Sequence, residues 1–274
     1  MFTSEDTQTC VGDLADHLRR YGIRHFANND YYWEWGAKRL GPLLTDQVDR
    51  MRMPLFEERV TAGDLLAFYD FIAHPKVSGV VHSMNADAIR ACGKFGGRHL
   101  HNRKKVLDLG CNIGYLSTWF ARLDSQRQVV GIDLSARSIE EAAKRAKSLG
   151  IENVRFEVRD LTRSVPGTDY DAIVDCQTLF SVGDVRAACR IIRSAMAPDG
   201  VLVSVVRLFH TEQAKEIVQT LNSAGIGLDY CQWIHCSDLG GDQLFLGAVA
   251  SIHQADLGER IDFDEQCRLV DELP

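Results

Sequence analysis

The sequence has no uninterrupted apolar run that approaches the ~20 residues of a membrane-spanning helix. Its first residues, MFTSEDTQTC, are acidic and polar rather than basic and then apolar, so no secretory signal is expected. The eight cysteines include no C-x-x-C pair, which argues against zinc fingers and disulfide frameworks. Buried thiols in a reducing compartment are the simpler expectation. We therefore predict a cytoplasmic protein without a membrane partner.

The chain also lacks an excess of positive charge. It carries 31 Lys and Arg against 38 Asp and Glu, a formal net charge of −7, which argues against broad affinity for phosphate backbones. No nucleic-acid partner is expected. The 274 residues are 45% hydrophobic and 25% charged, enough apolar material for one large domain or two modest ones.

Two patterns meet near residue 103. Before it, apolar residues recur at helical spacing around residues 11–18, 65–72 and 84–95, and the glycine-containing stretch 96–103 is interpreted as a connector. After it, short apolar runs alternate with amphipathic helical segments, which predicts parallel strands joined by right-handed crossovers. The expected strands span residues 105–110, 128–134, 154–161, 170–177 and 200–206.

Two further β-rich runs, 228–237 and 242–251, are separated by four residues. A link this short cannot hold a crossover helix, so the two runs are predicted to form an antiparallel hairpin. The sequence thus predicts a helical cap over residues 1–103, an α/β domain over 104–251 and an acidic tail over 252–274.

Acidic residues follow or end the first three strands. Asp108 precedes the glycine-containing turn GCNIG, Asp133 ends the second strand, and Asp160 ends the third. In a parallel sheet these carboxyl ends form the ligand-binding edge. A carboxylate at Asp133 suits the two hydroxyls of a ribose, and Asp160 with the apolar Leu161 suits an adenine.

The turn after the first strand separates two ligand classes. Dinucleotide-binding folds require G-x-G-x-x-G, and Asn112 and Tyr115 occupy the second and third glycine positions. An anionic Asp108 would repel a pyrophosphate but suits a cationic amino-acid group. The predicted ligand is therefore a nucleoside that carries a positive amino acid, namely S-adenosyl-L-methionine.

Residues 104–251 resemble a class I S-adenosylmethionine-dependent methyltransferase. The resemblance rests on an ordered set of segments: VLDLGCNIGYLS, GIDLS, VRDL, YDAIVDCQTLF and MAPDGVLVSVV, followed by the hairpin. It implies a Rossmann-like, doubly wound, mostly parallel sheet of seven strands with an antiparallel last strand. The sequence departs from the family at Asn112, where a glycine is common; asparagine tolerates unusual backbone angles better than most residues.

The resemblance also implies which residues hold the cofactor. Those at the first turn would hold its methionine part, those after the second and third strands its ribose and adenine, and those after the fourth would lie near the methyl group. The implied set is Asp108, Gly110, Asn112, Gly114, Asp133, Leu134, Asp160, Leu161, Cys176 and Gln177.

Other family patterns are missing. Asp175-Cys176-Gln177-Thr178 stands where amino-methylating enzymes of nucleic acids have (D/N)PP(Y/F). Because Cys176 follows an aspartate rather than a proline, it is expected to be inert. The fifth strand is followed by Phe209-His210 rather than the Asp-Asn pair of metal-dependent catechol enzymes, so no metal is expected.

The cap is expected to exclude water and shape the acceptor pocket. Its densest aromatic segment either lines that pocket or packs the cap onto the sheet. This segment contains Phe26, Tyr31, Tyr32, Trp33 and Trp35. His210 is a candidate base or pocket residue, although a histidine that merely starts a helix is the favoured explanation; His82 and His235 are weaker candidates.

The preferred function is metal-independent methyl transfer to an O, N or C atom of a small molecule, by in-line displacement in a capped pocket. A protein or RNA methyltransferase whose cap docks a larger partner is an alternative, as is a non-catalytic S-adenosylmethionine-binding domain. The sequence does not decide the oligomeric state, and a homodimer is possible.

Overall fold

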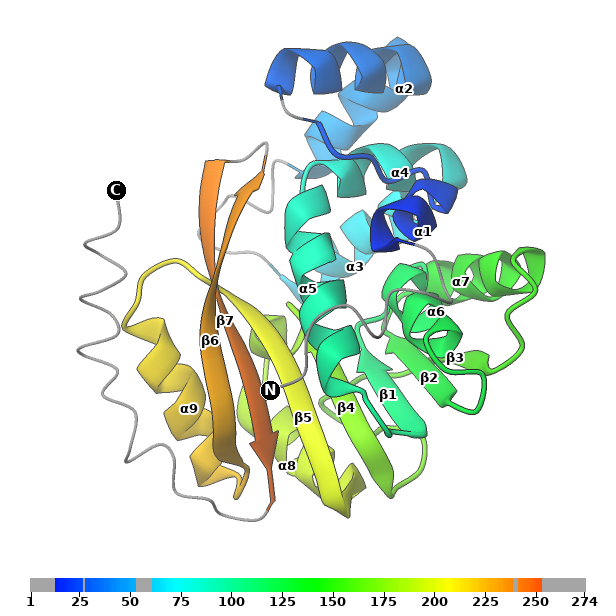
Figure 1. Ribbon diagram of the computed structural model, residues 1–274. Helices are drawn as coiled ribbons and strands as arrows, with labels where there is room; N and C mark the ends of the chain where they lie inside the picture. Colours follow the sequence, from blue (N-terminus) through cyan, green and yellow to red (C-terminus); the bar gives the residue numbers. More distant parts are fainter. Residues whose placement is uncertain (1–12, 27, 53–60, 239–240, 253–274) are drawn as a thin grey trace.

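The computed structural model describes residues 13–26, 28–52, 61–238 and 241–252 (Figure 1). Nearly all of the predicted acidic tail therefore lies outside the described residues. The described part is built around one seven-stranded sheet in the order β3-β2-β1-β4-β5-β7-β6. Its strands are β1 (Lys105–Leu109), β2 (Gln128–Asp133), β3 (Val154–Val158), β4 (Tyr170–Cys176), β5 (Met196–Leu208), β6 (Gly227–Asp238) and β7 (Gly241–Ser251).

The helices fall into two groups along the chain. In the described part of the chain, five precede the first strand: α1 (Leu14–Arg20), α2 (Asn29–Arg52), α3 (Ala62–Ile72), α4 (Pro75–Ser83) and α5 (Ala86–His99). The others alternate with the strands: α6 (Tyr115–Arg122), α7 (Ala136–Ser148), the short 3-10 helix η2 (Leu179–Ser181), α8 (Val185–Ala195) and α9 (Gln213–Ser223).

The sheet topology confirms the predicted fold. β1 pairs in parallel with both β2 and β4, β4 pairs in parallel with β5, and β7 is antiparallel to its neighbours β5 and β6. The order of the strands thus reverses at β1, and the carboxyl ends of β1 and β4 form the edge at which such sheets bind ligands.

Alternate residues of each strand face opposite helical layers, because the side-chain period of a strand is two. In β1, Val106 belongs to a core shared with α5 and α6, whereas Leu107 and Leu109 belong to a core shared with α8 and α9. Asp108 has the parity of Val106, so its side chain lies on the α6 side of the sheet.

The helices before β1 do not form one unit. Residues of α1 and α5, such as Leu18 and Phe95, share the core of the sheet, whereas α2, α3 and α4 form a smaller cluster of their own. We call this the α2–α4 cluster; its buried residues are Val48, Phe68, Ile72, Val77 and Val81. Figure 1 shows α2 at the top of the molecule, above the helices that pack on the sheet.

The connector expected at 96–103 is partly wrong, because α5 continues to His99. The two glycines let this helix approach α6 closely. A Cβ at Gly96 would lie 2.9 Å from the ring of Phe120, and one at Gly97 would lie 3.1 Å from Leu123. Among the described residues, no helix has the length and apolar composition needed to cross a bilayer.

Candidate functional site

The turn after β1 adopts backbone angles that favour glycine. Gly110, Asn112 and Gly114 have φ values of 61°, 49° and 78°, all in the left-handed region. Asn112 adopts this conformation because asparagine enters it more readily than most residues other than glycine. A Cβ at Gly110 would lie 2.1 Å from Oγ1 of Thr178, which brings the loop after β4 against this turn. The turn leads directly into α6, whose N-terminal cap is Gly114.

Asp108 is a buried carboxyl group at the centre of this edge. It is 2% exposed, and Ser117 of α6 donates a hydrogen bond of 2.5 Å to its Oδ2. Burial raises the pKa of Asp108 to about 7; the Ser117 hydrogen bond opposes this, and the nearby carboxylates of Asp175 and Asp133 add to it. A cation placed here would favour the ionised form.

Asp133 joins the end of β2 to the turn after β1. Its Oδ2 accepts from the backbone N–H of Asn112 and its Oδ1 from that of Ser135, both at 2.9 Å. Burial raises its pKa against these hydrogen bonds, and the charge of Asp70 adds to the effect. Asp70 belongs to α3 and accepts a 2.5 Å hydrogen bond from the Ser135 hydroxyl, so the α2–α4 cluster reaches this strand end.

The residues after β2 and β3 are exposed to different degrees. Leu134 is 48% exposed, beside Asp133, whereas Leu161 is 7% exposed and packs into the α8–α9 core. Asp160 accepts hydrogen bonds from the hydroxyl and the backbone N–H of Thr162, and these together with Arg163 lower its pKa although burial opposes them. Leu134 thus offers an accessible apolar surface at this edge, and Leu161 does not.

The loop after β4 is held by a buried carboxylate. Asp175 accepts from the backbone N–H groups of Thr178 and Leu179 and from the Ser204 hydroxyl, at 2.6–2.9 Å. Gln177 follows with a φ of 65°, and its Nε2 donates to Sγ of Cys92 in α5. Cys176 also contacts Cys92, and this contact and burial raise the pKa of its thiol well above the ordinary value.

The carboxylates at this edge of the sheet fit the polar groups of the predicted cofactor. Asp108, Asp133 and Asp160 end or follow three neighbouring strands, and the first two are close enough for their charges to interact. Carboxylates accept hydrogen bonds and attract cations, which suits an ammonium, ribose hydroxyls and an exocyclic amine. Among the described residues, no cluster of three or more metal-ligating side chains occurs.

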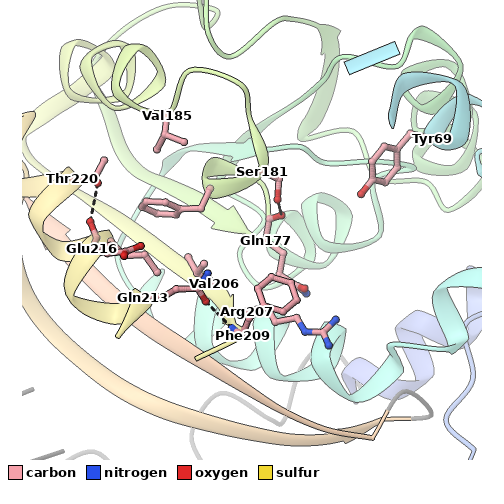
Figure 2. A pocket seen from close by; sticks show the side chains of 12 residues that line it. Tyr69, Gln177, Ser181, Val185, Val206, Arg207, Phe209, Gln213, Glu216 and Thr220 are labelled. Carbon is pink, nitrogen blue, oxygen red and sulfur yellow. Dashed lines mark hydrogen bonds between the residues drawn. The ribbon is translucent and has the colours of Figure 1, made fainter. Parts of the chain in front are cut away.

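A cavity of about 460 Å³ opens at the carboxyl ends of β4 and β5 (Figure 2). Figure 2 shows Tyr69 of α3 on one side and Thr220 of α9 on the other. Of the predicted cofactor residues, Gln177 at the end of β4 belongs to this lining, and the other nine do not. The remaining lining residues are Phe180, Ser181, Val185, Val206, Arg207, Phe209, Gln213, Glu216 and Ile217.

The predicted pocket residues lie away from this lining. Tyr31 and Trp33 are 68% and 49% exposed on α2. Tyr32 is buried and donates a hydrogen bond to the carbonyl of Val80, which packs α2 against α4. His210 is exposed directly after the lining residue Phe209.

The helical region brings three residues to the site: Tyr69 and Asp70, which the sequence did not predict, and His82, which it gave only as a weak candidate. Tyr69 lines the cavity, and burial and the charge of Asp133 raise its pKa. Asp70 binds Ser135, and the His82 ring lies 5.2 Å from that of Tyr115 at the start of α6. The sequence feature that could have indicated Tyr69 and Asp70 is that these two polar residues stand side by side within the otherwise apolar helical segment 65–72.

Comparison with known proteins gives consistent matches. Residues 100–243 match the family described as "Methyltransferase domain". A malonyl-[acyl-carrier protein] O-methyltransferase of Bacillus anthracis is 26% identical over 131 residues, which cover 45% of this chain and 48% of that protein. An uncharacterised RNA methyltransferase of Halalkalibacterium halodurans is 39% identical over 67 residues, covering 24% of this chain and 14% of that protein.

The fold has a similar solved structure. The mitomycin 7-O-methyltransferase MmcR superposes with a TM-score of 0.54 at 14% identity, covering 74% of this chain and 66% of that one. The chain spans between 14% and 48% of the length of the two curated relatives above.

Proposed function

Because the chain belongs to the class I S-adenosylmethionine-dependent methyltransferases, as the resemblance predicted, we propose that it methylates a small-molecule acceptor bound in the cavity beside β4 and β5. The observation that carries this proposal is the position of the cavity. It begins at Gln177, at the carboxyl end of β4, and extends to α9. Its volume of about 460 Å³ lies within the range of small-molecule sites.

We assign the cofactor groups to the strand-end carboxylates. Asp108 pairs with the ammonium of the amino-acid part, Asp133 accepts from the ribose hydroxyls, and Asp160 accepts from the adenine amine. Leu134 packs on the adenine, because its side chain is accessible at this edge. The Leu161 side chain supports the core below it.

The shape of the cavity favours an elongated acceptor. Gln213, Glu216, Ile217 and Thr220 form one face of α9, and seven residues of helix extend about 10 Å. Phe180 and Ile217 supply apolar contact. Thr220 donates to the carbonyl of Glu216 in its own helix, so its hydroxyl proton is already used.

The reaction requires positioning more than covalent help from the protein. The cofactor supplies an electrophilic methyl group on a sulfonium, and the chain must hold the acceptor atom about 3–3.5 Å away in line with the departing sulfur. Tyr69 and the aromatic cavity residues exclude water there. For a hydroxyl or ammonium acceptor, His210 is the proposed base because it follows the cavity residue Phe209.

An RNA acceptor is the second candidate, since one relative is named as an RNA methyltransferase. That match covers 24% of this chain, and the net charge of −7 opposes a phosphate backbone. Small-molecule methylation therefore explains the charge and the cavity more simply.

A labelling experiment separates these outcomes. The protein is incubated with methyl-labelled S-adenosylmethionine and either total RNA or a metabolite extract freed of protein and RNA. We expect label in the metabolite fraction and a strong loss with Ile217→Trp, which fills the cavity. Glu140→Gln is the control, because Glu140 is exposed on α7 and pairs only with Lys144 in the described structure.

Cofactor binding is measured in the same preparations. Asp133→Ala should weaken S-adenosylhomocysteine binding by at least about tenfold in calorimetry, since hydrogen bonds to a charged group are lost. Ile217→Trp should leave that affinity unchanged. Label in RNA alone would refute the small-molecule acceptor, and tight cofactor binding without any transfer would indicate a non-catalytic domain.

A further inference from the structure

The strand-end carboxylates leave one group of the cofactor without a partner. The amino-acid part of S-adenosylmethionine carries a carboxylate as well as an ammonium. Ionised aspartates accept hydrogen bonds and cannot donate them. Asp108, Asp133 and Asp160 therefore repel that carboxylate, and a donor must come from another part of the chain.

Four consecutive backbone N–H groups of the turn after β1, those of residues 111–114, are already engaged. The N–H groups of Cys111 and Gly114 donate to the carbonyls of Ile132 and Cys111, at 2.8 and 2.9 Å. The N–H of Asn112 donates to Asp133, and that of Ile113 donates to the Asn112 side chain at 2.7 Å. All four consecutive N–H groups of the turn are engaged within the protein, so a side chain is the expected donor.

His82 of α4 is placed to supply that donor. It is 9% exposed, and its ring meets that of Tyr115, the first residue of α6, edge-on at 5.2 Å. The Asn112 side chain interacts with it and raises its pKa, which places the ring beside the turn after β1. Its buried Nε2 has no hydrogen-bond partner among the described residues.

A buried polar atom without a partner calls for a specific explanation, because most such atoms in folded proteins are paired. Burial lowers the pKa of His82 to about 4. The Asn112 side chain opposes this shift, and the charge of Arg145 lowers the pKa further. The imidazole is thus neutral at pH 7 until an anion approaches it. A carboxylate beside the ring would supply both the missing partner and a reason for a histidine at this position.

We propose that His82 binds the carboxylate of the cofactor's amino-acid end, so that α4 completes a site whose other residues come from the sheet. This inference rests on the proposed function, and it assigns to the α2–α4 cluster a direct part in cofactor recognition. Asp108 then holds the ammonium and His82 the carboxylate.

The test compares three ligands that share the adenosyl group. S-adenosylhomocysteine has both charged groups, its decarboxylated analogue keeps only the ammonium, and 5′-methylthioadenosine has neither. The variants are His82→Phe, which keeps a ring against Tyr115 without a donor, and His82→Gln, which keeps a donor. Val81→Ala is the matched control, because Val81 is the neighbouring residue on α4 and packs in the α2–α4 cluster.

His82→Phe should weaken S-adenosylhomocysteine binding about tenfold to hundredfold, as expected for a hydrogen bond to a charged group. The affinities of His82→Phe for the other two ligands should stay within about twofold of those of the unmodified protein. His82→Gln should lose less affinity for S-adenosylhomocysteine than His82→Phe does. Val81→Ala should not discriminate between the ligands. Unchanged affinity for 5′-methylthioadenosine also reports that the variant is folded.

Two results would overturn the inference. An equal loss for all three ligands would mean that His82 acts through packing alone. No loss in His82→Phe would place the carboxylate elsewhere, such as at the first-turn N–H groups of α6. If the unmodified protein bound none of the three ligands, the proposed function itself would fail.

Discussion

The buried Asp108 predicts that cofactor affinity increases with pH. Its pKa is about 7 in the folded protein, mainly through burial, and only the ionised form pairs with an ammonium. About one tenth of the molecules are ionised at pH 6 and about nine tenths at pH 8. The affinity for S-adenosylhomocysteine should therefore rise about tenfold over this range. His17 and His82, whose pKa values burial lowers to about 4, remain neutral throughout it.

The same group predicts the opposite change in stability. The ordinary pKa of the carboxyl is 3.8, so the folded state binds more protons than the unfolded state between pH 3.8 and about 7. The free energy of unfolding thus falls as pH rises through this window and is level above it. Between pH 6 and pH 8, Asp108 alone should lower it by about 1.4 kcal/mol in the free protein.

Calorimetric titration at pH 6, 7 and 8 and constant ionic strength measures the affinity, and urea unfolding at the same pH values measures the stability. Asp108→Asn should remove both dependences and bind weakly at every pH. 5′-Methylthioadenosine, which has no ammonium, should bind equally well throughout. The reasoning is refuted if the unmodified protein shows constant affinity for S-adenosylhomocysteine, or if Asp108→Asn keeps the tenfold rise.

Three further predictions concern the scaffold of the site. Gly110→Ala should lower the free energy of unfolding in urea by about 2–4 kcal/mol, because the new Cβ would clash with Thr178. Gly150→Ala is the control: Gly150 also has a positive φ, +67°, but no atom lies within 4 Å of its Cβ position, so the loss should be about 1 kcal/mol. Arg127→Lys should cost about 2 kcal/mol in the same assay, since its buried guanidinium donates to three backbone carbonyls. Asp175→Ala should cost about 3 kcal/mol and accelerate hydrogen exchange in residues 177–181, whose loop it holds; unchanged exchange would contradict this role.

The strands were predictable because strands of a parallel sheet are buried on both faces and therefore read as short, nearly continuous apolar runs. The run 105–110 became Lys105–Leu109, and 128–134 became Gln128–Asp133. The fifth strand begins earlier than expected, at Met196, because a Pro-Asp-Gly sequence there reads as a turn while the strand continues past an irregular register.

The helical region was less predictable because its pattern depends on distant contacts. Glycine favours turns locally, yet Gly96 and Gly97 lie inside α5, where α6 approaches too closely for side chains. The helix α2 was not expected at all. It contains Gly41 with φ 73° and then Pro42, which interrupt any regular pattern.

The candidate site likewise contains residues whose position could be predicted from the sequence and residues whose position could not. The topology of a parallel sheet brings Asp108, Asp133 and Asp160 to one edge, so their placement follows from the order of the strands. Tyr69 and His82 reach that edge through the packing of α3 and α4, which hydrophobic periodicity does not encode. His82 therefore remained only a weak candidate for a base until its contact with Tyr115 was visible.

The two buried carboxylates at the reversal of the strand order, Asp108 and Asp175, differ in how fully their hydrogen-bonding capacity is used. Asp175 is saturated by three donors, so its loop is fixed before any ligand arrives. Asp108 points to the other face and, among the described residues, has a single hydrogen-bond donor, Ser117. A change in the β4 loop therefore has to keep or replace the Asp175 anchor on one face, whereas Asp108 keeps unused acceptor capacity on the other.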